Sequence, residues 1–385
     1  MIIHLMDYTQ RQLDLSKDLK TKSVLLLGPR RTGKSQLIHH SLTADFNYNL
    51  LEADTFRELS ANPEKIRQRI GPKTKLVIID EVQKLPVLLD EVHALIENTN
   101  TRFVLTGSSA RKLKRNYTSL MAGRARVRNL FPFTARELDK KWNLEKIINY
   151  GSLPPVYLSD DPMDELKDYV GLYLKEEIMM EALVRKIENF SRFLNFAALS
   201  NGQILNFESV GSDSQVPART IREYYSILSD TLLGYMIEPI RSTSKRKSTS
   251  TGKFYFFDIG VTNSLTGRKN IAPKTKEFGD NFEHFILLEM MAYKNYLRKD
   301  DSLGFWNSPQ EGEIDFVINN EIAIEVKATS NVGPAHLSGF AKFEKNEKAK
   351  RKILVCQEKH PRKINEIEII PVKDFLEILW DGDIF

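Results

Sequence analysis

Short apolar runs alternate with helix-like stretches over the first 150 residues of the chain. The runs that have the length and composition of strands lie at 23–27, 48–51, 76–80, 102–106 and 126–131. Strands that alternate with helical stretches usually pair in parallel, with the helices packed on the faces of the sheet. This pattern therefore predicts an α/β fold with a parallel sheet for residues 1–150.

The pattern changes twice after residue 150. Residues 151–240 are predicted to be almost entirely helical, and residues 242–252 are small, polar or basic, as in an exposed loop. Apolar runs at 254–257, 314–318, 322–327 and 353–356 then indicate a second mixed α/β region. Since a chain of 385 residues has room for two or three domains of about 150 residues, we expect domains at 1–150, 151–252 and 253–385.

The first predicted strand is followed by a G-x-x-x-x-G-K-S motif and then by a helical pattern, the arrangement of a phosphate-binding loop. Its glycines allow main-chain N–H groups to turn toward a polyphosphate at a helix N-terminus, where the helix dipole favours anions. Lys34 is expected to reach the β- and γ-phosphates of a nucleotide, and the Ser35 hydroxyl to bind Mg²⁺. The expected nucleotide-binding residues are Gly28, Pro29, Arg30, Arg31, Thr32, Gly33, Lys34, Ser35 and Gln36.

Two later strands end in side chains that suit the same site. An apolar strand ends in Asp80 and Glu81, and a buried parallel strand brings its last residues to the edge where a phosphate-binding loop lies. We expect Asp80 to hold Mg²⁺ and Glu81 to orient and deprotonate a hydrolytic water. The next strand ends at Thr106, whose hydroxyl is placed to reach the γ-phosphate or the water. The alternative is that the hydroxyls here cap the following helix, a role that Ser108 or Ser109 would fill.

The order of these features resembles that of AAA+ ATPases, which have the same loop, the same acidic strand end, a polar residue on the next strand and an arginine before the fifth strand. In that superfamily the arginine in the position of Arg124 acts as a finger that completes the site of a neighbouring subunit. Arg126 and Arg128 compete for the role here. The resemblance implies an ATPase with ATP and Mg²⁺ as cofactors, assembled as a homo-oligomer in a hexameric ring.

Three further features make the resemblance more specific. They are the arginine pair Arg30-Arg31 in the loop, the sequence Gly151-Ser152-Leu153-Pro154, and the sequence from Lys253 to Gly260. Together they resemble a bacterial and archaeal branch of these ATPases that carries a C-terminal domain of uncharacterised function. The resemblance extends over most of the chain.

Residues 188–240 have the pattern of a winged helix. Helices are predicted at 193–199, 206–210 and 217–228, and the runs 234–237 and 253–257 would form the two strands of the wing. In a DNA-binding protein, Arg219, Thr220 and Arg222 would lie at the exposed start of the recognition helix. Lys245, Arg246 and Lys247 at the tip of the wing would meet phosphates. The alternative is a lid or a protein contact with a solvated basic loop.

Alternation in the C-terminal region places acidic side chains together. Ile314, Phe316 and Ile318 share one face of a strand, and the apolar residues of 322–327 share one face of the next. A three-residue loop pairs 318 with 322, 316 with 324 and 314 with 326. The same register sets Asp315 opposite Glu325 and places Lys327 on the same side.

Two carboxylates and a lysine suit Mg²⁺-dependent phosphodiester cleavage, in which the acids hold the metal and the lysine serves the phosphate. Asp315 with Glu325-Val326-Lys327 resembles the PD-(D/E)xK core of restriction-endonuclease-like folds, although Ile314 stands in the place of the proline. Glu283 matches the acidic residue that those folds carry on a preceding helix. The expected metal ligands are thus Glu283, Asp315 and Glu325, and the expected catalytic lysine is Lys327. The alternative is a hairpin with a solvated Glu–Lys pair.

Composition adds little to this picture. A net charge of +5 is compatible with a polyanionic partner, and the single cysteine, Cys356, excludes an internal disulfide and fits a cytoplasmic protein. No apolar run approaches the roughly 18 residues of a membrane helix, and the N-terminus has no signal-peptide pattern. We therefore expect an ATPase that binds and processes DNA, with a metal-dependent nuclease activity in its last domain. The alternative is an ATP-gated signalling or protein-remodelling switch whose nuclease-like domain is inactive.

Overall fold

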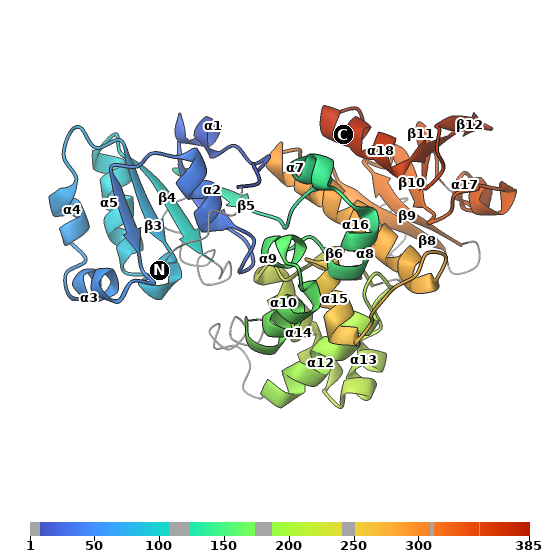
Figure 1. Cartoon of the computed structure of the whole chain (residues 1–385), viewed down its shortest axis with the longest axis horizontal. Helices are drawn as coiled ribbons and strands as arrows, with labels where there is room; N and C mark the ends of the chain where they lie inside the picture. The colour runs from blue at the N-terminus through green and yellow to red at the C-terminus, as the bar shows by residue number, and fades with distance from the viewer. Residues whose placement is uncertain (1–7, 108–122, 174–186, 241–250, 309–311, 346) are drawn as a thin grey trace.

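The computed structural model describes residues 8–107, 123–173, 187–240, 251–308, 312–345 and 347–385. They form an N-terminal, a helical and a C-terminal lobe, in the order of the chain (Figure 1). None of the described helices is both long and apolar enough to cross a membrane.

The N-terminal lobe is a parallel sheet of strand order β2-β3-β4-β1-β5. The three central strands begin where the sequence predicts, and the two edge strands lie one or two residues away from their predicted positions. The strands are β1 (Ser23–Leu27), β2 (Phe46–Asn49), β3 (Leu76–Asp80), β4 (Arg102–Gly107) and β5 (Ala125–Asn129). The helices are α1 (Leu15–Leu19), α2 (Lys34–Ser41), α3 (Ala53–Ala61), α4 (Lys65–Arg69) and α5 (Leu88–Asn98), with a 3-10 turn at Val82–Lys84.

Helices cover both faces of this sheet because its central strands are apolar on both faces. Val24 and Leu26 of β1 pack with residues of α2, whereas Leu25 and Leu27 pack with residues of α3 and α5. A parallel sheet covered in this way carries its ligand-binding groups at the carboxyl edge of the strands. The predicted site residues follow β1, β3 and β4 at that edge.

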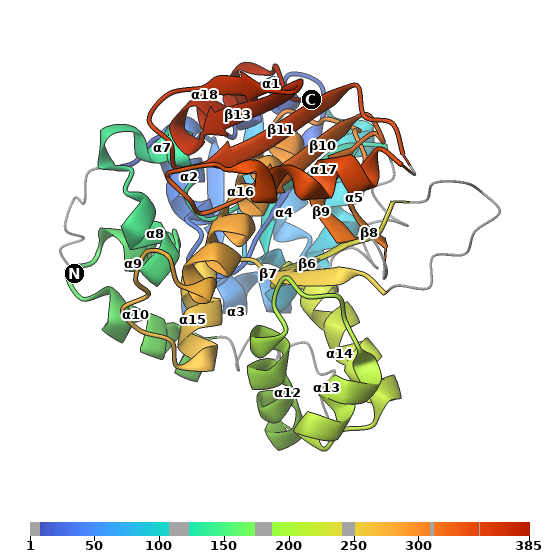
Figure 2. The same cartoon turned by 90° about the vertical axis from the view of Figure 1, so that its right-hand side faces the viewer.

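The helical lobe begins with short helices and continues with three longer ones and a hairpin. The first helices are α7 (Ala135–Leu138), α8 (Leu144–Tyr150), α9 (Pro154–Leu158) and α10 (Pro162–Asp168), with 3-10 and π turns at Asp139–Lys141 and Tyr169–Tyr173. They are followed by α12 (Ile187–Leu199), α13 (Phe207–Ser214), α14 (Ala218–Asp230), β6 (Gly234–Ile237), β7 (Lys253–Phe256) and α15 (Ile259–Thr266). Figure 2 shows α12, α13 and α14 projecting away from the two sheets.

The two strands predicted after the third long helix pair with each other. β6 and β7 are antiparallel, with Gly234 opposite Phe256 and Ile237 opposite Lys253. A domain boundary after residue 252 would separate these two strands. The structure thus places β7 with the helical lobe, because its main-chain hydrogen bonds are made to β6.

The C-terminal lobe contains a six-stranded mixed sheet of order β12-β13-β11-β10-β9-β8. Its strands are β8 (Leu303–Ser308), β9 (Gly312–Ile318), β10 (Ile322–Val326), β11 (Arg351–Cys356), β12 (Arg362–Ile364) and β13 (Ile367–Pro371). Its helices are α16 (Lys276–Tyr296), α17 (Ser338–Phe343) and α18 (Val372–Asp381), with a 3-10 turn at Pro334–Leu337. The register of β9 and β10 pairs Ile318 with Ile322 and Phe316 with Ile324, which confirms the three-residue loop. Cys356 is buried on β11.

Helix α16 joins the lobes through a shared core. One cluster of buried residues contains Leu26 of β1, Phe285 and Met290 of α16, and Phe316 of β9. Figures 1 and 2 show α16 between the two sheets, with the C-terminal sheet packed along it. The helix is therefore in position to contact both predicted sites.

Candidate functional site

The phosphate-binding loop passes close to the end of β5. A Cβ atom on Gly28 would lie 2.6 Å from the carbonyl oxygen of Leu130, so this close approach requires glycine. Gly33 has a φ of +94° and forms the N-cap of α2, which makes Lys34 the first residue of the helix. The loop therefore ends at a helix N-terminus, as its motif predicts.

Lys34 folds back over the loop. Its Nζ donates to the carbonyl oxygens of Gly28 at 2.7 Å and Pro29 at 3.1 Å, and the residue is buried. Thr32 is buried as well, and its hydroxyl donates to Pro29. Gln36 is exposed in the first turn of α2. The ammonium is thus held beside the main-chain groups that are expected to surround a phosphate.

Hydrogen bonds join the ends of three elements next to this lysine. The Ser35 hydroxyl donates to Oδ2 of Asp80 at 2.7 Å, and the Thr106 hydroxyl donates to Oδ1 of the same carboxylate. The structure therefore brings together the two side chains predicted to hold Mg²⁺. It also places Thr106 against Asp80, while the alternative capping residues Ser108 and Ser109 lie outside the described residues.

Glu81 follows β3 in an uncommon backbone conformation. Its φ of +60° is left-handed, which is rare for a residue other than glycine and often marks a functional position. Its N–H donates to the Thr106 hydroxyl at 3.0 Å, and the side-chain amide of Gln83 donates to its carboxylate. Glu81 is therefore fixed on both its main chain and its side chain beside the loop.

Arg31, the second arginine of the loop, contacts the helical lobe. Arg31 has a left-handed φ of +62°, and its guanidinium pairs with Glu165 of α10 at 2.6 Å. Both side chains are about one third exposed. Arg30 is half-buried. The loop is thus tied to a helix 134 residues away in sequence.

Arg124 lies at the opposite edge of the sheet from the loop. It precedes β5, whose first residue pairs with Ser23, the first residue of β1, and it forms an ion pair with Glu97. Its two competitors, Arg126 and Arg128, both pair with the buried Asp18, and Arg128 is itself buried. Of the three arginines, Arg124 has the most exposed side chain.

A second polar cluster lies on the C-terminal sheet. Lys327 pairs with Glu325 at 2.5 Å and with Asp315 at 3.5 Å, and both carboxylates are buried. Asp315 also accepts a hydrogen bond of 2.7 Å from the N–H of Val326. The structure therefore brings together the three residues that the hairpin register predicts.

The cluster extends to residues that sequence reasoning missed. Lys253 of β7 pairs with Glu283 of α16 at 3.3 Å and also with Glu313 of β9, and Tyr255 donates to Glu283 at 2.5 Å. Glu313 stands two residues before Asp315, so alternation along the strand was an available signal. Nothing local to Lys253 pointed to this position, because its partners come from other elements.

Burial shifts the pKa values in the cluster. Loss of solvent, partly offset by the charge of Lys253, raises the pKa of Glu283 to about 7. Burial and the charge of Asp315 raise the pKa of Glu325 well above its ordinary value. Burial alone would lower the pKa of Lys253, but the neighbouring carboxylates raise it above its usual range. Lys253 therefore stays charged, while burial favours the protonated forms of Glu283 and Glu325.

The geometry of this cluster bears on whether it can bind a metal ion. Across the ranges that the structure describes, no group of three or more His, Cys, Asp or Glu side chains is arranged to hold a metal ion. Glu283, Asp315 and Glu325 instead share their surroundings with the ammonium groups of Lys253 and Lys327. The cluster does not have the form of a three-carboxylate metal centre, and metal binding there stays a prediction.

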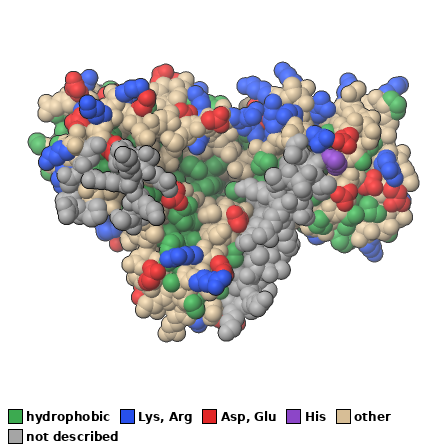
Figure 3. Space-filling model, turned by 180° about the vertical axis from the view of Figure 1, so that it is seen from behind, with side chains coloured by type: hydrophobic (Ala, Val, Ile, Leu, Met, Phe, Trp, Pro, Cys, Tyr) green, Lys and Arg blue, Asp and Glu red, His purple; other side chains and the backbone are tan. Residues whose placement is uncertain are grey.

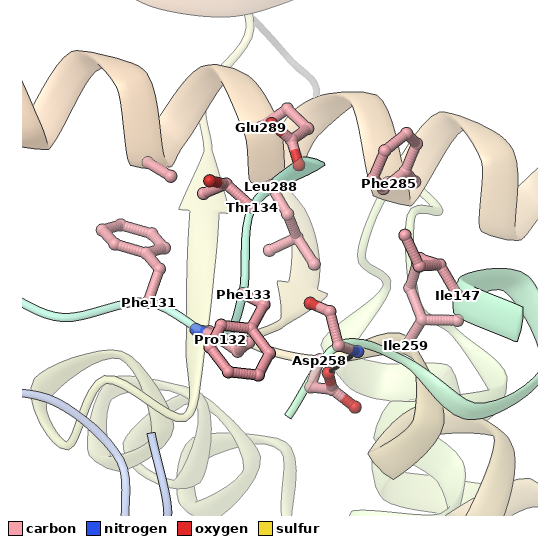
Figure 4. Close-up of a pocket in the computed structure, with 12 residues that line it drawn as sticks. Phe131, Pro132, Phe133, Thr134, Ile147, Asp258, Ile259, Phe285, Leu288 and Glu289 are labelled. Atoms are coloured by element: carbon pink, nitrogen blue, oxygen red, sulfur yellow. Dashed lines mark hydrogen bonds between the residues drawn. The ribbon is translucent and has the colours of Figure 1, made fainter. Parts of the chain in front are cut away.

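A small cavity lies between the segment that follows β5, the helical lobe and α16 (Figure 4). Phe131, Phe133, Asp258, Phe285 and Glu289 are among the residues that line it, and its volume is only about 10 Å³. That is space for about one water molecule, and far too small for a nucleotide. Burial raises the pKa of Asp258 to about 6 and that of Glu289 to about 7.

Three family models match the chain in sequence. Residues 20–139 match a family described as AAA domain, and residues 141–272 and 278–375 each match a family described as a domain of unknown function. The first match covers the parallel sheet and its loop, and it agrees with the predicted P-loop domain. The other two leave the winged-helix and nuclease-like predictions without a test.

Individual relatives are distant. An uncharacterized protein of Haemophilus influenzae is 23% identical, over 92% of this chain and 91% of its own length. The Aeropyrum pernix Orc1 protein in complex with DNA is 13% identical over 68% of this chain and 95% of that one, with a TM-score of 0.26. The Bacillus subtilis DNA clamp loader delta protein is 12% identical over 56% and 87%, with a TM-score of 0.22. At such scores these two likenesses say nothing about the function of this chain.

Proposed function

We propose that this chain hydrolyses ATP with Mg²⁺ and uses the reaction to act on DNA. The observation that carries the first part is the hydrogen-bonded chain of Ser35, Asp80 and Thr106, which lies beside the loop that holds Lys34. Three neighbouring elements bring these groups to one edge of the sheet, where nucleotide phosphates bind in folds of this class. The match of residues 20–139 to the AAA domain supports the same reaction.

Each side chain of this site has its own role in hydrolysis. Lys34 and the main chain of the loop bind the phosphates, and Ser35 with Asp80 would hold the metal, which neutralises phosphate charge when bound. Glu81 takes a proton from the attacking water, since its carboxylate lies next to this edge and is oriented by Gln83. Thr106 fixes both Asp80 and Glu81.

The position of Arg124 supports assembly into an oligomer. Because Arg124 lies at the amino edge of the sheet, it is far from the loop of its own chain, and its exposed side chain is available to a neighbouring subunit. An arginine supplied in this way stabilises charge at the transferred phosphoryl group. A hexameric ring, in which each subunit serves the next, is the proposed assembly.

Two exposed arginines near the start of α14 support DNA as the partner, although each also pairs with a surface glutamate, Glu223 or Glu208. The arrangement of α12, α13, α14 and the β6–β7 hairpin agrees with a winged helix, and Arg219 and Arg222 have exposed side chains near the start of α14. Figure 3 shows other Lys and Arg side chains gathered along the upper edge of the molecule, away from the helical lobe that carries α14. Lys245, Arg246 and Lys247, the proposed tip of the wing, lie outside the described residues.

Salt dependence tests this surface. Affinity for a labelled DNA duplex should fall with salt, and Arg219→Gln with Arg222→Gln should reduce the log–log slope by about one to two. The double variant Lys359→Gln with Lys363→Gln is a matched control, because it removes the same charge from an exposed strand region of the C-terminal lobe. If both double variants reduce the slope equally, the effect reflects net charge alone, and α14 is not the DNA-binding surface.

A second candidate function is favoured by the lysine pairs of the C-terminal cluster. An active nuclease of the PD-(D/E)xK kind would use Asp315 and Glu325 for a metal and Lys327 for the phosphate. Lys253 and Lys327 already neutralise these acids and their neighbours. The alternative is therefore an ATP-gated signalling or remodelling switch whose C-terminal domain has a nuclease-like fold and no cleavage activity.

One experiment separates the two candidates. ATP hydrolysis is measured without DNA and with single-stranded, duplex and branched DNA, and cleavage of the same DNA is followed in Mg²⁺ and Mn²⁺. Stimulation by one DNA form supports action on DNA, and cleavage that Asp315→Ala abolishes would add the nuclease activity. If no DNA form changes the rate of ATP hydrolysis and no DNA is cleaved, the result favours the switch.

A further inference from the structure

Arg11 is a buried cation in a segment that precedes every recognised motif. It is 7% exposed, and its guanidinium makes an ion pair of 3.0 Å with Glu137 of α7. It also stacks on the ring of Phe133 with its carbon 5.0 Å from the ring centre. A buried charge persists only when it is paired and hydrogen-bonded, so the contacts of Arg11 define its place in the fold.

One of these contacts reaches the phosphate-binding loop. Nη1 of Arg11 donates to the carbonyl oxygen of Thr32 at 2.7 Å. In a trans peptide the C=O and the following N–H point in opposite directions, so this bond turns the N–H of Gly33 away from Arg11. Arg11 therefore sets the orientation of the peptide that joins the loop to the first turn of α2.

The remaining contacts join the loop to the rest of the molecule. Nη2 of Arg11 donates to the carbonyls of Phe131 at 2.5 Å and Pro132 at 3.3 Å, and lies 3.5 Å from the hydroxyl of Tyr296. That hydroxyl also accepts the N–H of Phe131 at 3.1 Å. Tyr296 is the last residue of α16, so a single side chain links the loop with the end of this helix.

The end of α16 is in turn packed against α18. Trp380 of α18 donates its indole N–H to Glu289 at 2.9 Å, and its ring lies 5.5 Å from the ring of Tyr293 and 6.2 Å from that of Tyr296. A shift of Tyr296 relative to the loop would therefore change the surroundings of an indole. Trp380 is one of three tryptophans in the chain, the others being Trp142 and Trp306.

We propose that Arg11 is a positioning residue of the nucleotide site, and that it transmits nucleotide binding to the C-terminal lobe through Tyr296. This inference rests on the proposed function, because it requires that the loop bind a nucleotide. When phosphates engage the loop, the Thr32–Gly33 peptide adjusts, and Arg11 passes the adjustment to the end of α16 and to α18. Arg11 is buried, paired with Glu137 and bonded to three main-chain carbonyls, so it has little freedom to absorb the change alone.

The experiment uses the full chain with Trp142→Phe and Trp306→Phe, which leaves Trp380 as the only indole. Affinity for Mg²⁺ with a non-hydrolysable ATP analogue is measured by calorimetry, and Trp380 emission is recorded in the same titration. Arg11→Lys keeps the charge but not the fork of donors, so it should weaken the analogue about tenfold and remove the emission change. Tyr296→Phe removes only the hydroxyl, so it should keep the affinity within about threefold and still remove the emission change.

Tyr293→Phe is the matched control. Tyr293 is on the same helix, packs against the same indole and, among the described residues, has no hydrogen-bond partner for its hydroxyl. It should keep both the affinity and the emission change. Should Arg11→Lys not fold, Tyr296→Phe and Tyr293→Phe still decide the coupling.

The outcomes separate this inference from the proposed function. Binding without a change at Trp380, or an emission change that persists in Tyr296→Phe, overturns the inference alone. Absence of any binding overturns the proposed function as well. Loss of the emission change in Tyr296→Phe, with binding retained and Tyr293→Phe unaffected, supports the coupling.

Discussion

Two clusters of acids and lysine lie on the two sheets of this molecule, and they are built in opposite ways. At the nucleotide edge, Asp80 accepts hydrogen bonds from two hydroxyl groups, and Lys34 donates to two main-chain carbonyls. On the C-terminal sheet, Lys327 pairs with carboxylates, as does Lys253. The described hydrogen bonds of Asp80 and Lys34 are thus made to neutral groups, whereas the second cluster pairs charges with one another.

The difference bears on what each cluster can bind. Neutral partners can be exchanged for a stronger one when a phosphate or a metal ion arrives, and each hydrogen bond lost to a charged group is worth about 1.5–3 kcal/mol. A ligand entering the second cluster would have to replace ion pairs in a buried setting, where an unpaired charge costs several kcal/mol. The first cluster is suited to reversible binding, and the second to holding elements together.

The largest expected effects are at the nucleotide edge. Lys34→Ala should abolish nucleotide binding, because the phosphates lose their fixed cation. Glu81→Gln should keep ATP bound and lower hydrolysis by about 10² to 10⁴, since the amide cannot take the proton. Filter binding of labelled ATP and a phosphate-release assay measure the two effects. Equal hydrolysis by Glu81→Gln and the unaltered chain would remove Glu81 from the mechanism.

Substitution of Arg124 tests whether the nucleotide site needs a residue from a neighbouring subunit. Arg124→Ala should lower ATP hydrolysis by about 10³ or more if the arginine acts as a finger. Mixing it with Glu81→Gln should restore part of the rate, because one subunit lends the arginine and the other the intact base. Hydrolysis is followed across mixing ratios, with light scattering in ATP to record assembly. A lack of rescue at every ratio, with a monomer in ATP, would contradict action between subunits.

Lysine removal from the second cluster should affect stability instead. Lys253→Met leaves Glu283 and Glu313 without their cation, and we expect it to lower the free energy of unfolding by about 3–5 kcal/mol. Lys350→Met is the control, because Lys350 pairs with Glu321 on the surface and such pairs contribute about 1 kcal/mol or less. Urea unfolding measures both. If both variants lose the same free energy of unfolding, the buried ion pairs of Lys253 contribute no more to stability than a surface pair does.

Glu289 tests the effect of burial on a carboxyl group that, among the described residues, does not pair with a lysine. This buried carboxyl accepts from Trp380 and from the N–H of Ala135, and burial, with a small contribution from Glu137, raises its pKa to about 7. A raised acid pKa stabilises the folded state below the unfolded pKa of about 4.5, and that contribution is lost as pH rises toward 7. The fall in unfolding free energy between pH 5 and pH 8 should therefore be about 1–3 kcal/mol smaller in Glu289→Gln. Parallel pH profiles of the two proteins would contradict this.

Local patterns account for what the sequence predicted well. The loop motif, the acidic end of β3 and the pairing of Ile318 with Ile322 all depend on residues close together in the chain, where periodicity and turn length decide the structure. Arg11 and Lys253 were missed because each is defined by partners on distant elements. The contacts of Arg11 span from 21 to 285 residues of sequence, and no local pattern encodes contacts of that range.

The position of Lys253 constrains how this architecture can change in evolution. The residue belongs to the β6–β7 hairpin, within the segment matched at 141–272, yet its ammonium serves acids that lie in the segment matched at 278–375. A lineage that exchanged only the later segment would inherit Glu283 and Glu313 without their cation. The two segments are therefore expected to be inherited as a unit, and loss of the lysine to be tolerated only together with loss of the acids.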